Sequence, residues 1–96
     1  MIVNEEKFLL QLYVAGKTAK SIVALDNLKK YCKQHLKNRY KIEVIDLVLK
    51  PHLAEGAQIF AIPTLVKKMP KPIIKIIGDL SNEHRVLVGL NITPNP

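Results

Sequence analysis

The sequence is poor in the residues that support redox, metal and base-stacking chemistry. Its 96 residues contain one cysteine and no tryptophan, and aromatic residues make up only 5%. Cys32 alone forms no internal disulfide, and there is no Cys-x-x-Cys pair for dithiol exchange or zinc binding. Three tyrosines and two phenylalanines offer few platforms on which nucleic acid bases stack. These shortages argue against a thiol-disulfide enzyme, a zinc protein and a sequence-specific nucleic-acid reader.

Long apolar runs are also missing. No run approaches the roughly 20 residues of a membrane span, and the first residues lack the basic and apolar regions of a signal peptide. A chain of 96 residues supports one hydrophobic core. We therefore expect a single cytoplasmic domain over residues 1–96, with residues 93–96 as a flexible tail and no membrane partner.

Positive charge is in excess. Fifteen Lys and Arg against eight Asp and Glu leave a formal net charge of +7, which favours acidic partners by long-range attraction. Eight of the basic residues lie between Lys17 and Lys41, where Asp26 is the lone acid. A second basic set consists of Lys67, Lys68, Lys71 and Lys75. With two arginines and few aromatics, the pattern favours a solvated surface or an acidic protein partner, and specific nucleic-acid binding is not expected.

The first half of the chain has the pattern of a strand, a helix and a second strand. Residues 7–14 form a mostly apolar run closed by Ala15 and Gly16, which is typical of a central strand. Thr18 or Ser21 can cap a helix over residues 18–37, and the β-branched run at 40–49 indicates a second strand. The apolar face of the helix is predicted to contain Ile22, Leu25, Leu28, Cys32 and Leu36. This order predicts a βαβ unit with parallel strands.

The second half gives conflicting signals, because Gly56 and three prolines interrupt every candidate element. Residues 52–60 favour a short helix after Pro51, and residues 64–66 and 73–77 favour a hairpin. Ser81 is the expected N-cap of a last helix over residues 82–90. The resulting order, βαβαββα, is the thioredoxin-like plan. Residues 86–88 also suit a strand, and the proline-rich stretch also suits short helices, so a second arrangement stays open.

Catalytic patterns are absent or incomplete. Gly16-Lys17-Thr18 follows a predicted strand, but the phosphate-loop pattern requires a glycine where Gln11 stands. Asp46 and Asp79 each end an apolar run, where an acid more often terminates an element than catalyses. Cys32 lies on the apolar helix face and is expected to be buried and unreactive.

The three histidines also lack a ligand pattern. His35, His52 and His84 have no Cys, Asp or Glu at metal-ligand spacing and are interpreted as solvated surface residues. We therefore expect a protein that is not an enzyme and that holds no metal and no cofactor.

Short segments along the chain resemble the KaiB family of circadian clock proteins. They are LYVAG at 12–16, VID at 44–46, LAE at 53–55, Ala61 with PTL at 63–65, IIGDLS at 76–81, and VL at 86–87 with GL at 89–90. They occur in the order and spacing of that family. The resemblance runs from about Phe8 to Leu90, nearly the whole chain.

The resemblance implies an α/β fold related to thioredoxin, with an N-terminal βαβ unit and a metamorphic C-terminal half. One implied state is a homotetramer of order βαββααβ, and the other is a thioredoxin-like monomer of order βαβαββα. A sequence that serves two packings gives mixed local signals, as the second half does. The implied function is a non-enzymatic regulator that binds a KaiC-type hexameric ATPase and recruits a histidine kinase, in circadian timing or stress adaptation. A homo-oligomer, dimer or tetramer, is expected.

The resemblance also implies site residues. The partner face in the thioredoxin-like state is expected on residues 52–63 and the following strand, and consists of His52, Glu55, Gln58, Ala61 and Lys67. The alternative interpretation of Lys67 is a solvated lysine. The expected fold-switch positions are Phe8, Pro63, Pro70, Pro72, Gly89 and Asn91, and the Ile62-Pro63 bond is expected to be cis in the thioredoxin-like state. Alanine at Gly89 should favour a helix over residues 82–90 by about 0.5–1 kcal/mol.

The chain departs from cyanobacterial members of the family at several points. Its 96 residues include no acidic C-terminal tail, Lys71 interrupts a usual proline run, and Asn91 and Pro94 replace a usual acid and tyrosine. Val23, Lys41 and Glu43 differ on the face implicated in KaiA contact. KaiA binding is therefore not expected, and the chain resembles a KaiB from a reduced, KaiA-less system. The alternative function is a redox-inactive thioredoxin-like module that binds another acidic protein or nucleic acid.

Overall fold

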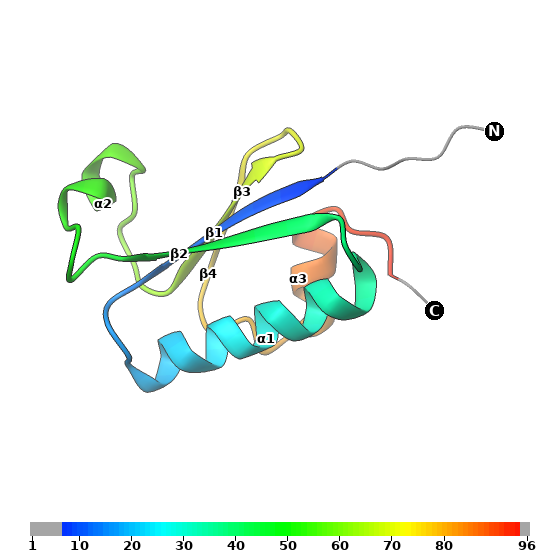
Figure 1. The fold of residues 1–96 in the computed structure, drawn as a ribbon, viewed down its shortest axis with the longest axis horizontal. Coiled ribbons are helices and arrows are strands. Elements are labelled where there is room, and N and C mark those ends of the chain that lie inside the picture. Colours follow the sequence, from blue (N-terminus) through cyan, green and yellow to red (C-terminus); the bar gives the residue numbers. More distant parts are fainter. Residues whose placement is uncertain (1–6, 95–96) are drawn as a thin grey trace.

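A four-stranded sheet with strand order β2-β1-β3-β4 organises the chain (Figure 1). The computed structural model describes residues 7–94. Its elements are β1 Phe8–Val14, α1 Ala19–His35, β2 Tyr40–Asp46, α2 His52–Gly56, β3 Thr64–Met69, β4 Ile74–Ile77 and α3 Glu83–Gly89. The order βαβαββα confirms the thioredoxin-like alternative of the sequence prediction, and residues 86–88 lie in a helix and not in a strand.

The first half forms the predicted βαβ unit. β1 and β2 pair in parallel from Phe8 opposite Tyr40 to Val14 opposite Asp46, and α1 connects them. β2 is shorter than expected because Asp46 turns the chain. Its Oδ1 accepts hydrogen bonds from the backbone N–H groups of Gly16 and Val48, both at 2.9 Å. Asp46 thus ends an element, as predicted.

Helix α1 is confirmed, with a correction to its apolar face. Thr18 is the N-cap, and its side chain accepts a hydrogen bond from the Ser21 backbone N–H. The buried face follows Ala24, Leu28 and Cys32, which are four residues apart. Ile22 was assigned to this face but is 47% exposed, because it lies two residues before Ala24 and therefore on the other side of the helix.

The second half adds two antiparallel strands and two short helices. β3 pairs with β1 and with β4, and residues 70–73 form the turn between β3 and β4. The last helix is capped by Asn82 and not by Ser81, since Asn82 Oδ1 accepts from the Arg85 backbone N–H at 3.0 Å. The helix predicted over residues 52–60 ends at Gly56.

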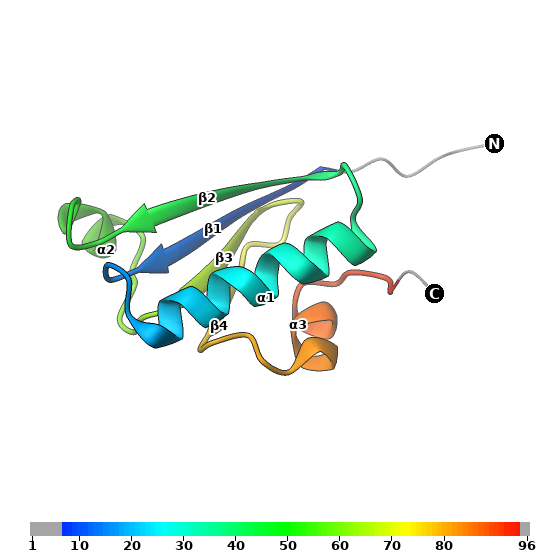
Figure 2. The ribbon, with the colours of Figure 1, turned by 60° about the horizontal axis from the view of Figure 1, so that its bottom comes forward.

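Hydrophobic cores of unequal size lie on the two faces of the sheet. α1 and α3 lie against the same face (Figure 2), where Leu10, Leu12 and Val14 of β1 join the larger core. Because side chains alternate along a strand, Tyr13 points to the other face. There it packs with Leu47, Ile59 and Val66, and with the partly buried α2 residues Leu53 and Ala54. The small second core is what holds α2 on the sheet.

Candidate partner interface and fold-switch positions

Helix α2 presents part of the expected partner face. Its apolar side packs on the smaller core, so His52 and Glu55 are exposed to solvent. Gln58, just after the helix, is exposed and has a left-handed φ of 56°. Lys75 from β4 fixes this end, because its Nζ donates hydrogen bonds to the carbonyls of Ala57 at 2.8 Å and Gln58 at 3.1 Å. The helix is therefore tied to the sheet while its polar side stays open.

The connection from α2 to β3 exposes an aromatic side chain that the sequence analysis missed. Phe60 is 93% exposed, next to the half-buried Ala61. The Ala61 carbonyl accepts a hydrogen bond of 2.6 Å from the Thr64 hydroxyl, and the Ile62-Pro63 bond is cis, as expected. Leu49 before α2 is 77% exposed. The sequence did contain a signal for this exposure. Residues 59–62, Ile-Phe-Ala-Ile, are four consecutive apolar residues that follow the short helix α2.

Lys67 corrects the sequence interpretation. It was predicted on the partner face or, alternatively, as a solvated lysine, and its relative exposure of 1% shows that the solvated alternative is wrong. Its strand position explains this burial: Lys67 pairs with Leu10 and follows Leu65 by two residues, so it points to the face that α1 and α3 cover. Its Nζ donates to the Leu90 carbonyl at 3.2 Å and lies 5.9 Å from the centre of the Phe8 ring. Lys67 therefore does not belong to an exposed face in this fold.

Four of the predicted residues lie around one pocket. Phe8, Lys67, Pro70 and Asn91 all line a cavity of about 450 Å³ between the start of β1, the β3–β4 turn and the chain after α3. The other fold-switch residues lie elsewhere: Pro63 is buried before β3, Pro72 is in the β3–β4 turn and Gly89 ends α3. The Met69-Pro70 and Lys71-Pro72 bonds are cis. The structure thus gathers part of the predicted set and leaves the rest apart.

Gly89 has a close neighbour that the sequence did not reveal. A Cβ added to Gly89 would lie 2.9 Å from Cδ1 of Ile76 on β4. The helix-propensity gain expected for alanine is therefore opposed by a contact that forces the end of the Ile76 side chain to move.

The turn between β1 and α1 contains no cysteine. In thioredoxin-like enzymes this is the position of the reactive cysteines, and here it contains Gly16, Lys17 and the N-cap Thr18. The single thiol, Cys32, is 1% exposed inside the core, and burial raises its pKa to about 12. The expectation that Cys32 is a buried structural residue is confirmed.

Charged side chains elsewhere serve the fold. Asp79 ends the segment after β4, and hydrogen bonds from the side chain and backbone of Ser81 lower its pKa. His35 was interpreted as a solvated residue, which is wrong: it is 7% exposed, and its Nε2 lies 2.8 Å from Oε2 of Glu83 on α3. The partner is 48 residues away in sequence and was invisible to a spacing argument. Within residues 7–94 no three His, Cys, Asp or Glu side chains are grouped to hold a metal ion.

The architecture belongs to the thioredoxin-like class. The N-terminal domain of SasA from Synechococcus elongatus matches with a TM-score of 0.72 and 22% identity, covering 95% of this chain and 89% of that one. Mitochondrial thioredoxin 3 from Saccharomyces cerevisiae matches with a TM-score of 0.70 and 21% identity, covering 90% and 78%. The fold is thus that of thioredoxins, although a cysteine pair is absent from the sequence.

The chain belongs to the KaiB family. The KaiB domain matches residues 11–92. The circadian clock oscillator protein KaiB of Nostoc punctiforme is 47% identical over 92 residues, which cover 96% of this chain and 88% of the relative. The relatives are named as clock proteins and not as enzymes, and membership supports a regulatory role in timing. None of the helices between residues 7 and 94 has the length and apolar character to cross a membrane.

Proposed function

We propose that this chain is a non-enzymatic clock-type regulator in the cytoplasm that binds a KaiC-type hexameric ATPase. Family membership supports the partner class, because the relatives are named circadian clock oscillator proteins. The proposed role is circadian timing or, in a system without KaiA, simpler timing or stress adaptation. A histidine kinase is a further proposed partner, again on the basis of family resemblance.

The single observation that carries this proposal is the exposed Phe60 beside α2. An aromatic ring that is 93% exposed is costly to leave in water and is a common anchor of protein interfaces. The same segment also carries exposed polar side chains, those of His52, Glu55 and Gln58, and Ala61 lies beside Phe60 in the chain. We therefore place the ATPase contact on residues 48–62 and leave Lys67 out of it.

We also propose that the chain switches between this thioredoxin-like arrangement and a βαββααβ homo-oligomer. The short elements of the second half support this, because helices of five and seven residues are too short to be stable alone. Their conformation depends on packing, so another packing with a similar free energy is accessible.

Binding to a purified KaiC-type ATPase, measured by biolayer interferometry, tests the partner. Phe60→Ala should weaken binding at least about tenfold, since aromatic anchors contribute about 2 kcal/mol or more. Val88→Ala is the matched control, because Val88 is also an exposed apolar residue, at 65%, but lies on α3. Equal binding of wild type and both variants would remove the α2 segment from the interface, and no binding by the wild type would remove the ATPase as partner.

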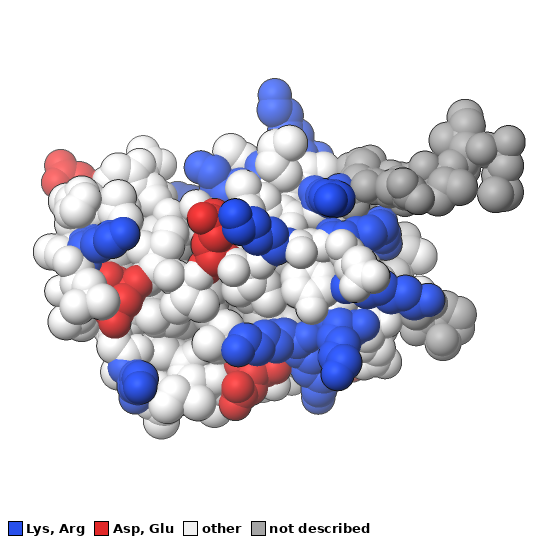
Figure 3. All heavy atoms as spheres, viewed as in Figure 1, with Lys and Arg blue, Asp and Glu red and all other residues white. Residues whose placement is uncertain are grey.

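A second candidate function is a redox-inactive module that binds another acidic protein or nucleic acid. The observation that favours it is the basic surface in Figure 3, where Lys and Arg gather over the half of the molecule that holds the C-terminal part of α1 and the β3–β4 turn. Binding of this kind should weaken steeply with salt, whereas an interface centred on Phe60 should not. A salt titration against the ATPase and against a mixed-sequence oligonucleotide separates the two functions.

A further inference from the structure

The pocket that collects Phe8, Lys67, Pro70 and Asn91 lies on elements other than α2. It has a volume of about 450 Å³, which is within the range of small-molecule sites. Its remaining polar lining comes from Arg39, between α1 and β2, from Lys71 in the β3–β4 turn and from Thr93 after α3. Four separate parts of the chain, the start of β1 included, therefore converge on one hollow at the end of the sheet where β1 starts.

The charge of Lys67 has no counter-charge among the described residues. Its Nζ has a hydrogen bond to the neutral Leu90 carbonyl and a contact with the neutral Phe8 ring, and residues 7–94 contain no carboxylate in an ion pair with it. A buried ammonium is unfavourable unless an anion or several hydrogen bonds compensate it. Because Lys67 is 1% exposed and lines an open pocket, the pocket is the place from which such an anion can reach it.

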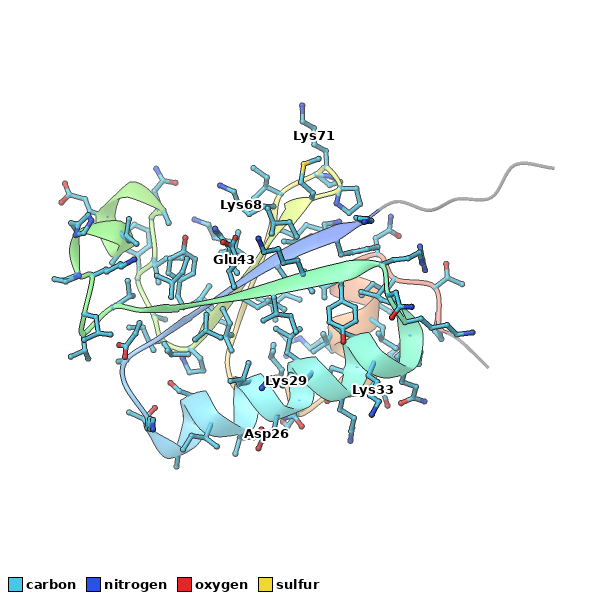
Figure 4. All side chains as sticks on the ribbon, in the orientation of Figure 1. Asp26, Lys29, Lys33, Glu43, Lys68 and Lys71 are labelled. Carbon is cyan, nitrogen blue, oxygen red and sulfur yellow. The ribbon has the colours of Figure 1, made fainter. Side chains whose placement is uncertain are left out.

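The rest of the lining is suited to an anion and not to a cation. Arg39, Lys67 and Lys71 are cationic, Asn91 and Thr93 carry hydrogen-bond donors, and none of the Asp and Glu residues between positions 7 and 94 lines the pocket. Figure 4 shows Lys71 extending away from the body at the tip of the turn, where its charge attracts anions from solvent. Figure 3 shows further Lys and Arg over this half of the molecule.

From these contacts we infer that the pocket binds a small multivalent anion of the phosphate class, held by Lys67 and Arg39. Arginine and a buried lysine together match the oxygens of a phosphate or pyrophosphate group. Phe8 is the one aromatic among the described residues that line the pocket, and it offers a nucleotide base no stacking surface because it is 7% exposed and is faced by Lys67. The ligand is therefore an inorganic phosphate, a pyrophosphate or a compact phosphate ester, and its site is independent of the ATPase contact.

Calorimetric titration of the full chain with sodium pyrophosphate, at constant ionic strength set with sodium chloride, tests the site. The wild type should bind with a stoichiometry of one. Lys67→Met, which keeps the length of the buried side chain, should weaken binding by about tenfold or more, as expected for loss of a charged hydrogen bond. Lys68→Gln is the matched control: it removes the same charge from the next residue, which is exposed and does not line the pocket.

Further readouts keep the test decisive. If Lys67→Met does not fold, as judged by circular dichroism, Arg39→Gln takes its place with the same expected loss. Amide NMR shifts on titration should be confined to the pocket, including Asn91 and Thr93. Equal weakening by Lys68→Gln, shifts spread over the basic surface, or tighter binding of citrate than of pyrophosphate would overturn the phosphate site, as would the absence of binding by the wild type.

Discussion

The two halves of this molecule are built from elements of very different length. Residues 8–46 form two strands of seven residues and a helix of seventeen. Residues 52–89 form helices of five and seven residues and strands of six and four. Isolated helices below about 12–15 residues are marginal in water. The second half therefore owes its conformation to packing against the first.

Backbone conformation shows the same contrast. Among the described residues, the non-glycine residues with left-handed φ in the second half are Gln58, Leu80 and Asn91, whereas Lys37 is the one in the first half. Such a conformation costs roughly 1–2 kcal/mol for most side chains. The contrast teaches that the first half is locally consistent, while the second half is held by contacts that its own sequence only partly favours.

Truncation of core side chains should show the largest difference in stability between the two halves. Leu28→Ala in α1 deletes a fully buried side chain and should lower the free energy of unfolding by about 2–5 kcal/mol. Leu87→Ala in α3 should instead loosen α3 and β4 before the rest, because a short unit opens locally. Urea unfolding with amide hydrogen exchange measures both. Equal acceleration of exchange throughout the chain in both variants would show that the halves open as one.

The contact between the halves through His35 and Glu83 should have a medium effect. Glu83→Ala removes one partner of a buried histidine, and we expect a loss of about 0.5–1.5 kcal/mol in unfolding free energy. Glu83→Gln retains a hydrogen-bonding group and should lose less. Glu55→Ala on the exposed side of α2 is the control for removing one carboxylate. The same loss in all three variants would mean that the contact contributes nothing.

Gly89 sharpens the comparison at a smaller scale. Helix propensity favours Gly89→Ala by up to about 0.5–1 kcal/mol, but the new Cβ meets Cδ1 of Ile76 at 2.9 Å. Ile76→Val removes that Cδ1 atom. We therefore expect the double variant to be more stable than the sum of the single changes by about 0.5 kcal/mol or more. Urea unfolding measures the stability changes of the two single variants and the double variant, and sedimentation measures the oligomer fraction. If the stability changes add and all variants sediment like the wild type, Gly89 is not a switch residue.

Cys32 offers a probe of the first half that leaves its stability unchanged. Burial raises its pKa from 9.0 to about 12, so the native thiol stays protonated at pH 8. Alkylation by iodoacetamide should therefore follow unfolding of the first half. Because an unfolded thiol ionises at lower pH, the stability that this group contributes is complete below about pH 9 and is lost as pH rises toward 12. Fast labelling at pH 8 without urea would contradict the burial argument.

Much of the fold followed from local patterns. The βαβ unit and the short helix after Pro51 were predictable, because strand and helix periodicities and caps are properties of neighbouring residues. The predicted end of an element was wrong where one side chain begins a turn, as Asp46 does at the end of β2. The choice between a helix and a strand at residues 86–88 stayed open, because a seven-residue helix is selected by packing.

The candidate sites were less predictable than the fold. Exposure of His52, Glu55 and Gln58 agrees with a surface role, but the exposed Phe60 beside them was missed. Lys67 looked like one lysine of a basic set, and no local signal distinguished it from Lys68. The two lysines differ because α3 and the chain after it pack over one face of β3. Of the two, Lys67 lies on that buried face.

The sequence by itself determined the first half of the fold, the lack of a cysteine pair and the resemblance to KaiB, because each depends on residue identity and spacing alone. The tertiary structure alone decided that Lys67 and His35 are buried and that Phe60 is exposed. The physical reason is that burial depends on which distant segments pack over a side chain. The partner of Lys67 is 23 residues away and that of His35 is 48 residues away, beyond the reach of any local pattern.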